Sequence, residues 1–273
     1  MTDSIGFIGL GNLGLPVAAN LLAAGYDLAV YNRTASKAAS LVDKGARLVS
    51  RPADAVSPGG IVVTLLWDGA AVESIVASDG FLERLGPGGI HLAMSTIAPE
   101  TARRLAALHA ARGSTYVEAP IFGRPEAAVA RQLWIPLAGP LDATARVQPL
   151  LTALGAQGVF DFGATIGAAT TVKLIGNFLI GSATRSLGEA LALAEGQGVD
   201  PQAVVDMLTQ TLFPAPIYRS YGTMIAQKIA PTTQNAIGLK DTGLFSDTAR
   251  QAGLPTPIAG LLAELMRGDQ GQA

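Results

Sequence analysis

Near its start the sequence contains the stretch Ile5-Gly6-Phe7-Ile8-Gly9-Leu10-Gly11-Asn12-Leu13-Gly14. The first four residues are apolar, as in a strand buried on both faces, and the last six fit the pattern G-x-G-x-x-G. In this pattern the first glycine allows a sharp turn, the second lets a pyrophosphate approach the backbone, and the third lets a helix pack closely on the strand. We therefore expect a strand, a tight glycine turn and the start of a helix.

The residues after the turn provide the context that such a motif requires. A helix is predicted through Pro16 to a stop at Gly25, and a second strand over residues 27–31. Free N–H groups and the positive end of the helix dipole would face a phosphate. We expect a dinucleotide to bind along Gly9, Leu10, Gly11, Asn12, Leu13 and Gly14. The alternative is an ordinary glycine-rich turn in another α/β fold.

The end of the second strand indicates which dinucleotide binds. An NAD site places a carboxylate there for the ribose hydroxyls, whereas this chain has Asn32-Arg33-Thr34. A guanidinium can bind a 2′-phosphate with two hydrogen bonds. The sequence therefore predicts NADP rather than NAD, with Asn32, Arg33 and Thr34 in the cofactor site. The alternative is that Arg33 is a solvated surface residue.

Composition excludes several classes of function. The chain has 273 residues, a formal net charge of −2 and 49% hydrophobic residues, so it favours two globular domains and lacks the basic footprint of nucleic-acid binding. It has no cysteine, and its two histidines, His91 and His109, give no reason to expect a metal site. We find no leader and no apolar run long enough to span a bilayer, so we expect a cytoplasmic protein without a membrane partner.

Strands and helices alternate up to about Asp161 and then give way to helices. The alternation predicts a doubly wound, mostly parallel α/β sheet of Rossmann type over residues 1–162. Ligands bind at the carboxyl ends of such strands, so the end of the predicted strand 60–66, with Leu65, Leu66, Trp67 and Asp68, should open onto the cofactor cleft. An all-helical domain, joined by a long helix, is predicted over residues 163–273 for substrate binding and dimerisation.

The long helix is predicted over residues 164–195. It is apolar around much of its circumference, and such a helix is normally buried. A small helical domain can hardly surround it, so we expect a homodimer through this helix. Pro214 and Pro216 predict a loop, and further helices are expected over residues 234–252 and 256–267.

Several of these stretches together resemble the β-hydroxyacid dehydrogenases, typified by 3-hydroxyisobutyrate dehydrogenase and related to 6-phosphogluconate dehydrogenase. The resemblance covers nearly the whole chain. It implies that Asn32-Arg33-Thr34 is the NADP-preferring version of the cofactor motif, and that Ser95-Thr96 lies beside the nicotinamide. It also implies that Lys240, in Leu239-Lys240-Asp241, approaches cofactor and substrate. The alternative for Lys240 is a surface lysine paired near Asp241.

The resemblance also implies a catalytic lysine, Lys173, and a substrate-binding asparagine, Asn177. Their spacing of four residues would place both on one face of the long helix. Neutral Lys173 would accept the hydroxyl proton during oxidation, and its ammonium form would return a proton during reduction. The alternatives are a lysine that extends to solvent or pairs with a carboxylate, and an asparagine that serves only the backbone.

One turn departs from the family pattern Pro-Val-Ser-Gly-Gly. Here it reads Pro120-Ile121-Phe122-Gly123-Arg124, so a phenylalanine replaces the serine and an arginine replaces a glycine. Arg131 also stands where relatives often have glycine. Phe122 would make the substrate site more apolar, and Arg124 could bind a carboxylate or point to solvent. The residues expected to bind substrate are Ser95, Phe122, Gly123, Arg124, Lys173 and Asn177.

Three hypotheses follow. The first is an NADP-dependent oxidoreductase that acts on a small β-hydroxyacid or the matching aldehyde or ketone. The second is an NADPH-dependent imine reductase acting on hydrophobic cyclic imines, favoured by Phe122 and opposed by Lys173. The third is a non-catalytic NADP-binding scaffold, which the retained lysine opposes.

Overall fold

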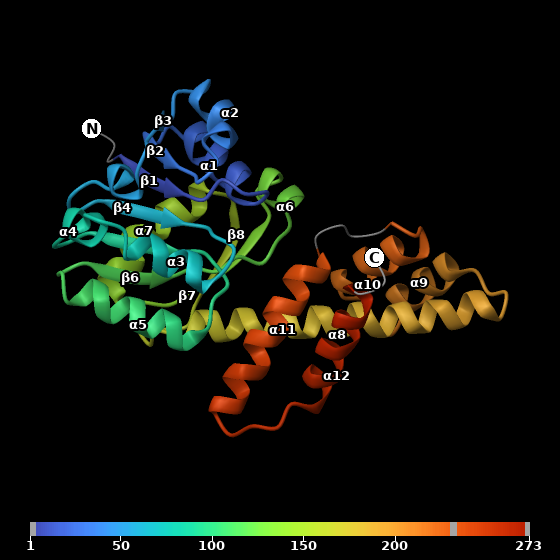
Figure 1. Ribbon diagram of the computed structural model, residues 1–273. Helices are drawn as coiled ribbons and strands as arrows, with labels where there is room; N and C mark the ends of the chain where they lie inside the picture. The colour runs from blue at the N-terminus through green and yellow to red at the C-terminus, as the bar shows by residue number, and fades with distance from the viewer. Residues whose placement is uncertain (1–3, 230–233, 271–273) are drawn as a thin grey trace. The chain divides into compact units, whose positions relative to one another are not determined.

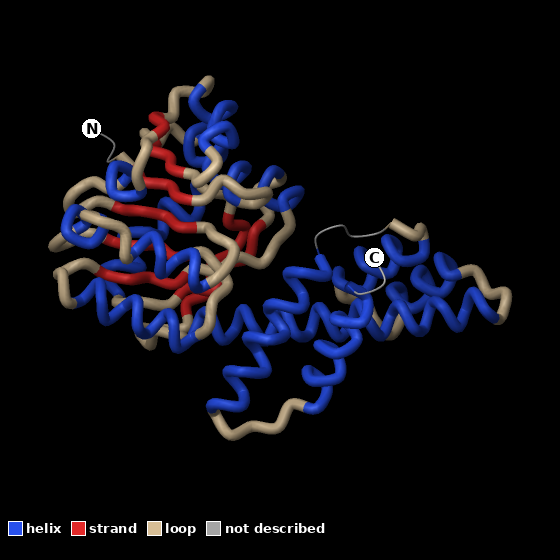
Figure 2. Tube along the Cα trace, viewed as in Figure 1, coloured by secondary structure: helices blue, strands red, loops and turns tan. Residues whose placement is uncertain are grey.

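The computed structural model describes residues 4–229 and 234–270. The chain forms two compact units, residues 1–173 and 174–273. In the described residues the first unit contains strands and helices, and the second contains helices (Figures 1 and 2). The mixed α/β architecture predicted from the sequence is therefore confirmed, whereas the predicted domain boundary between residues 162 and 163 stays a prediction.

The first unit is built on a parallel sheet of six strands. The strand order is β3-β2-β1-β4-β5-β6, with β1 and β4 in the middle. Each strand pairs in parallel with its neighbour; for example, Ile8 at the end of β1 is in register with Tyr31 and with Thr64. The bounds are β1 (Ile5–Ile8), β2 (Leu28–Tyr31), β3 (Arg47–Leu48), β4 (Ile61–Thr64), β5 (Ile90–Ala93) and β6 (Thr115–Glu118). All carboxyl ends consequently lie along one edge, which is where ligands of such sheets bind.

Helices cover both faces of this sheet (Figure 1). Phe7 and Val63 pack on one face against buried residues of α1 (Gly14–Ala23) and α7 (Leu141–Ala153). Ile8 and Val62 pack on the opposite face, against α3 (Gly69–Val76), α4 (Phe81–Leu85) and α5 (Pro99–Ala110). Residues adjacent in a strand point to opposite faces, so a short strand with apolar residues throughout is buried on both sides. Short elements complete the unit: η1 (Ala35–Ala38), α2 (Ala39–Val42), η2 (Pro52–Ala55) and α6 (Pro125–Val129).

A second, two-stranded sheet follows the main one. β7 (Leu133–Leu137) and β8 (Ala156–Asp161) pair in parallel. The chain after β6 contacts β7 through isolated antiparallel bridges, in which Phe122 N–H donates to the Trp134 carbonyl at 2.8 Å and Trp134 N–H donates to the Phe122 carbonyl at 2.9 Å. These bonds fix the position of Phe122 relative to the small sheet.

A chain of hydrogen bonds between polar side chains is buried in the first unit. The Thr64 hydroxyl lies 2.8 Å from His91 Nε2, His91 Nδ1 lies 3.0 Å from His109 Nε2, and His109 Nδ1 lies 2.7 Å from the Leu105 carbonyl. Because a carbonyl can only accept, His109 Nδ1 donates, and each earlier group along the chain then donates to the next. This pattern requires neutral rings, and burial favours them because it lowers the pKa of each histidine below its usual value.

The second unit consists, in its described part, of α-helices. They are α8 (Ala168–Gly196), which begins in the first unit, and α9 (Pro201–Gln210), α10 (Pro216–Ala226), α11 (Gln234–Gln251) and α12 (Pro257–Gln270). Phe178 of α8 stacks on Phe245 of α11, with ring centroids 4.4 Å apart. Among the described helices, none combines the length and the apolar character that a membrane crossing requires.

Two sequence predictions about elements are wrong. A helix, α10, forms where Pro216 predicted a loop, because proline at the first helical position loses only an N–H that has no partner there. The long helix begins at Ala168 and not at residue 164, since Gly167 has a left-handed backbone (φ 103°). Within one chain this helix leaves Ile175, Leu179 and Leu193 exposed.

Candidate active site

The glycine turn after β1 has the geometry that a dinucleotide needs. Gly9 has φ 105°, and a Cβ there would lie 2.3 Å from the Leu65 carbonyl oxygen. A Cβ at Gly14 would lie 2.0 Å from the Gly9 carbonyl oxygen, so this glycine allows α1 to pack on the turn. At Gly11, by contrast, a Cβ would meet no atom of the described chain within 4 Å. Open space at the middle glycine, between two closely packed ones, fits a pyrophosphate approaching the backbone.

Asn32 ties this turn to the end of β2. Its Oδ1 accepts a hydrogen bond from Leu10 N–H at 2.9 Å, and its Nδ2 donates to the Thr34 carbonyl at 2.8 Å. The amide thus positions backbone on both sides, while Arg33 and Thr34 are exposed beside it. A guanidinium at this position is available to an anion outside the end of β2.

The ends of β4 and β5 are also joined. Leu66 N–H donates to Ser95 Oγ at 2.8 Å, and Ser95 is buried, whereas Thr96 next to it is half-buried. Leu65 packs against the glycine turn through its carbonyl group. Asp68 follows at the start of α3, where its carboxylate caps the helix by accepting from Ala71 N–H at 2.8 Å. The carboxyl edge of the sheet therefore brings Gly9, Leu65, Leu66 and Ser95 together.

Lys173 lies in the first turns of α8 and is 8% exposed. Its Nζ lies 4.1 Å from the centroid of the Phe122 ring, a distance at which an ammonium is attracted to an aromatic face. Gly123, the next residue, has φ 147°, and a Cβ there would lie 2.5 Å from Leu133 Cδ2. Arg124 is exposed, and its Nε lies 3.5 Å from the Glu126 carboxylate. The loop after β6 therefore directs Phe122, and not Arg124, to the lysine.

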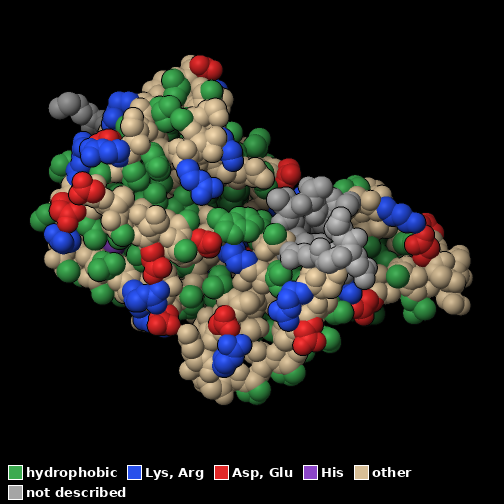
Figure 3. Space-filling view, viewed as in Figure 1, with side chains coloured by type: hydrophobic (Ala, Val, Ile, Leu, Met, Phe, Trp, Pro, Cys, Tyr) green, Lys and Arg blue, Asp and Glu red, His purple; other side chains and the backbone are tan. Residues whose placement is uncertain are grey.

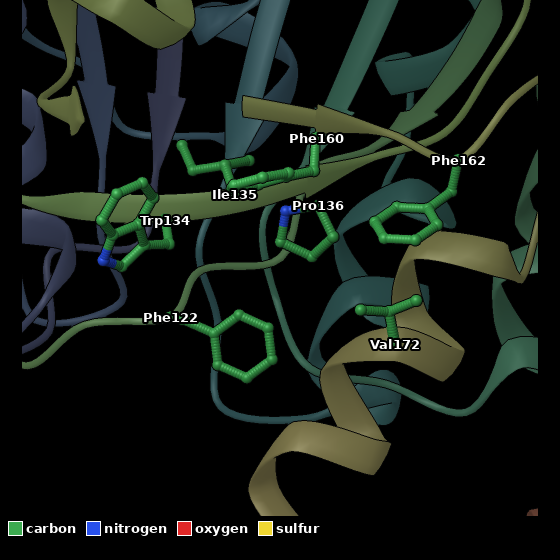
Figure 4. Close-up of a pocket in the computed structure, with 7 residues that line it drawn as sticks. All are labelled: Phe122, Trp134, Ile135, Pro136, Phe160, Phe162 and Val172. Atoms are coloured by element: carbon green, nitrogen blue, oxygen red, sulfur yellow. The ribbon is translucent and has the colours of Figure 1, made fainter. Parts of the chain in front are cut away.

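Phe122 also lines an apolar groove of about 220 Å³. Figure 4 shows Phe122, Pro136, Phe162 and Val172 around the same space, with Val172 contributed by α8. The remaining lining residues are Trp134, Ile135 and Phe160. Phe122 therefore contacts the lysine and also lines this groove.

A second cluster of predicted residues lies within the helical unit. Asn177 Nδ2 donates to Asp241 Oδ2 at 2.5 Å, and Lys240 Nζ lies 2.6 Å from Asp241 Oδ1. Asp241 is buried, and the side chain of Lys240 is 18% exposed. Asp241 therefore holds both residues, and the Asn177 amide is fixed with its nitrogen toward the carboxylate. The alternative described above for Lys240, pairing near Asp241, also matches this contact.

Glu118, the last residue of β6, is buried at the start of α8. Its carboxylate accepts hydrogen bonds from Gly167 N–H at 2.6 Å and from the Thr170 hydroxyl. Burial raises the pKa of the Glu118 carboxyl above its usual value, while its donors and the Arg103 guanidinium act in the opposite direction.

Two family models match successive parts of the chain. The NAD-binding domain of 6-phosphogluconate dehydrogenase matches residues 4–170, and the NAD-binding domain of NADP-dependent 3-hydroxyisobutyrate dehydrogenase matches residues 167–272. This chain belongs to the β-hydroxyacid dehydrogenase family. It is accordingly an oxidoreductase with an NAD(P)-binding domain of Rossmann type.

Individual relatives of this dehydrogenase support the same assignment. The chain is 40% identical to the oxidoreductase YfjR of Bacillus subtilis over 260 residues, which cover 94% of this chain and 90% of the relative. A structure of 3-hydroxyisobutyrate dehydrogenase from Mycobacterium tuberculosis with L-serine matches with a TM-score of 0.86 at 26% identity, over 99% of this chain and 94% of the other. A reductive aminase from Aspergillus terreus, with NADPH and ethyl-5-oxohexanoate, matches with a TM-score of 0.69 at 26% identity, over 100% and 95%.

Two residues of this family member were missed by the sequence analysis as site residues. Glu118 was not singled out at all, and Asp241 appeared only as part of the motif Leu239-Lys240-Asp241. A carboxylate directly after a run of buried strand residues was the available signal for Glu118, because an unpartnered charge is rarely buried. Within the described residues, no group of three or more His, Asp or Glu side chains is arranged to hold a metal ion.

Proposed function

We propose that the protein is an NADP-dependent oxidoreductase that uses Lys173 as its acid and base, acting on a small β-hydroxyacid or the matching aldehyde or ketone. The observation that carries the proposal is the buried position of Lys173, with Nζ against the Phe122 ring. A structural lysine normally extends its amine to water, whereas this side chain is buried with its amine against an aromatic ring. A proton donor held in a dry site suits the reduction of a carbonyl.

The preference for NADP rests on the end of β2. The residues that would hold the cofactor are the turn Gly9–Gly14, Leu65, Leu66 and Thr96, together with Asn32, Arg33 and Thr34. Arg33 supplies a positive charge where an NAD site would place a carboxylate, and Asn32 is occupied with backbone contacts. Lys240 is the remaining residue that we propose binds the cofactor.

When bound, the nicotinamide cofactor supplies or accepts the hydride. The residues of this chain manage the proton and the position of the substrate. In reduction, the Lys173 ammonium donates its proton to the oxygen of the carbonyl as negative charge develops there; in oxidation, neutral Lys173 removes the hydroxyl proton. Asn177, whose amide is fixed by Asp241, would hydrogen-bond the reacting oxygen or its neighbour.

The substrate class is the point on which alternatives differ. Dehydrogenation of a β-hydroxyacid agrees with the retained lysine and with the similarity to 3-hydroxyisobutyrate dehydrogenase. Phe122, Trp134 and Phe162 make the first unit's side of the site apolar, and this observation favours the second candidate, NADPH-dependent reduction of hydrophobic cyclic imines. Ser95, Gly123 and Arg124 would contact the substrate without taking part in proton transfer. The Arg124 guanidinium, which lies near Glu126, would be able to bind a substrate carboxylate instead.

A turnover assay separates these functions. The purified protein is incubated with NADP and 3-hydroxyisobutyrate or L-serine, and in parallel with NADPH and succinic semialdehyde or 1-pyrroline, while absorbance of the reduced nicotinamide is recorded. We expect turnover of the hydroxyacid or the semialdehyde. Turnover of the imine alone would replace the proposal with the second candidate, and NADPH binding without turnover of a broad carbonyl and imine panel would favour a non-catalytic NADP-binding scaffold.

The proposal includes a homodimer formed through α8. Leu179 and Leu193, large apolar residues of this helix, are exposed in the single chain, and burying them against a second copy would remove that surface from water. We further expect the protein to work in the cytoplasm, where the NADP pool would serve it.

A further inference from the structure

We infer that Glu118 is a positioning residue for Lys173: its carboxylate caps the first turn of α8 and so fixes the direction in which the lysine points. This inference rests on the proposed role of Lys173 and extends it to a residue that makes no contact with the reacting atoms. Three observations carry it: the missing cap, the location of the contacts on one face of the helix, and the burial of the carboxylate.

The first observation is that α8 has no capping side chain of its own. Gly167 immediately precedes the first helical residue, Ala168, and glycine cannot cap an N–H group with a side chain. Glu118 supplies the acceptor from another segment, 49 residues earlier in the sequence, by accepting from Gly167 N–H at 2.6 Å and from the N–H and hydroxyl of Thr170. The two N–H groups are donors that the start of a helix leaves without intrahelical partners.

The second observation is that the same face of α8 makes two contacts with one short segment. Thr170 and Lys173 are three residues apart and therefore share a face of the helix. Thr170 contacts Glu118, and Lys173 contacts Phe122, four residues further along the loop. Two contacts on one face fix the rotation of the helix about its axis. The contact of the Lys173 ammonium with the Phe122 ring is less directional and would not fix this rotation alone. Loss of the Glu118 contact would thus turn the lysine away from its position.

The third observation is that the cap is closely enclosed. Glu118 is 1% exposed and Thr170 is 2% exposed. A Cβ at Gly167 would lie 2.7 Å from an Arg103 guanidinium nitrogen and 3.3 Å from Pro99 Cβ, so the start of α8 is also held against α5. A buried carboxylate with several donors has little freedom to move, and it transmits the position of β6 to the helix.

Conservative variants distinguish positioning from mere stability. In Glu118→Gln, the amide oxygen can still accept from Gly167 N–H, but the amide nitrogen cannot accept from Thr170 N–H. We therefore expect kcat to fall by about threefold to tenfold, less than in Glu118→Asp. Glu118→Asp keeps the charge but is one methylene too short, and we expect kcat to fall by about 10- to 100-fold with KM for NADPH unchanged. Thr170→Val should lower kcat by about threefold to tenfold. Asp200→Ala, which removes the cap of α9, is the matched control and should leave kcat unchanged.

Two readouts are used, so that the result does not depend on one substrate. Kinetics are measured with the fastest compound of the panel above, and exposure of Lys173 is measured by mass spectrometry after labelling with an amine-reactive ester. We expect Lys173 to be protected in the parent and in Glu118→Gln, and labelled faster in Glu118→Asp. Parent-like kcat and protection in Glu118→Asp and Thr170→Val would overturn the inference, as would a Glu118→Gln variant as impaired as Glu118→Asp. A parent-like rate in Lys173→Ala would instead overturn the proposed function.

Discussion

At the scale of single residues, Lys173 is the centre of the proposed chemistry. Replacing it with alanine removes the proton donor and leaves the glycine turn untouched. We expect Lys173→Ala to lower kcat by about 10²- to 10⁴-fold, the usual contribution of a general acid, with nearly unchanged affinity for NADPH. Steady-state kinetics and a fluorescence titration of NADPH measure the two quantities. Lys44→Ala, at an exposed lysine of the same unit, is the control. A rate equal to the parent's would remove Lys173 from the mechanism.

Arg33 is the residue on which the choice between NADP and NAD depends. It is exposed beside Asn32, at the end of β2. A guanidinium that binds a phosphate contributes on the order of 1.5–3 kcal/mol, so Arg33→Ala should weaken NADPH binding by about 10- to 100-fold and NADH binding far less. Isothermal titration with both cofactors tests this, with Arg112→Ala, whose guanidinium pairs with Glu83, as the control. Equal losses for NADPH and NADH would show that Arg33 does not read the 2′-phosphate.

Arg131 has a left-handed backbone, with φ 58°, at the end of α6. A residue with a Cβ is strained there, which gives a physical reason for the glycine that relatives often carry. We expect Arg131→Gly to be more stable than Arg131→Ala by about 1 kcal/mol, because both variants lose the contact of the guanidinium with the Thr152 carbonyl and only glycine relieves the strain. Urea unfolding of the two variants gives the difference, and equal midpoints would contradict the expectation.

At the scale of elements, the predictable parts are those whose signal is local. The strand β1, the glycine turn and α1 were predicted because an apolar run, three spaced glycines and a proline lie within about twenty residues. α4, α6 and α10 were missed because they are short or begin at a proline, and proline was read as a break. The start of α8 was placed four residues too early, since the positive φ of Gly167 is set by packing against Pro99 and Arg103 and is not visible in the sequence.

The buried pair His91 and His109, on β5 and α5, makes stability depend on pH. Both pKa values are lowered in the folded state, chiefly by burial, so the native rings stay neutral while the unfolded chain begins to bind protons below about pH 6.5. The contribution of these two histidines to the free energy of unfolding is therefore fully present above about pH 6.5. It decreases as the pH falls below that value, by up to about 1.4 kcal/mol per pH unit for each histidine.

Urea unfolding at several pH values between 8 and 5.5 tests this dependence. We expect a free energy of unfolding that is flat above pH 7 and falls below pH 6.5. The variant His109→Gln, whose amide can replace part of the hydrogen-bond chain, should show a shallower fall, because one of the two titrating groups is removed. A parent protein equally stable at pH 5.5 and pH 7.5 would show that the rings can take up protons in the folded state.

At the scale of the whole molecule, the candidate site depends on contacts between distant parts of the sequence. The hydrogen bond from Gly167 to Glu118 joins residues 49 apart, and the one from Asn177 to Asp241 joins residues 64 apart. No local pattern encodes such pairs. The sequence therefore predicted Lys173 and Asn177 through a family resemblance, and missed Glu118, which contacts the start of α8, and Asp241, which contacts Asn177. The cofactor half of the site, by contrast, lies largely in one continuous segment.

The whole molecule also carries apolar surface that a single chain leaves exposed. Leu179 of α8 is 58% exposed, although it lies in a helix whose sequence is apolar around much of its circumference. If α8 forms a homodimer interface, Leu179→Glu should shift the protein toward the monomer in light scattering after size exclusion. Val129→Glu on α6, at a residue 70% exposed in the first unit, is the control and should not change the mass. A dimer that persists unchanged in Leu179→Glu would exclude this face.

The figures place positive and negative side chains side by side on the visible face of the first unit (Figure 3). Exposed ion pairs occur in the first unit, for example Arg104 with Glu73 at 2.7 Å. Each exposed pair contributes little to stability, but the mixture leaves no continuous basic area on this face for nucleic acid.

The position of Glu118 constrains how this protein can be recombined with its relatives. A chimaera joined in the loop before residue 163 would exchange the donors on Gly167 and Thr170 while keeping the carboxylate that needs them. With a junction within α8 after Lys173, β6, the capped first turn of α8 and the lysine would instead all come from the same parent protein. The two family models overlap at residues 167–170, the same short segment that such a graft must keep intact.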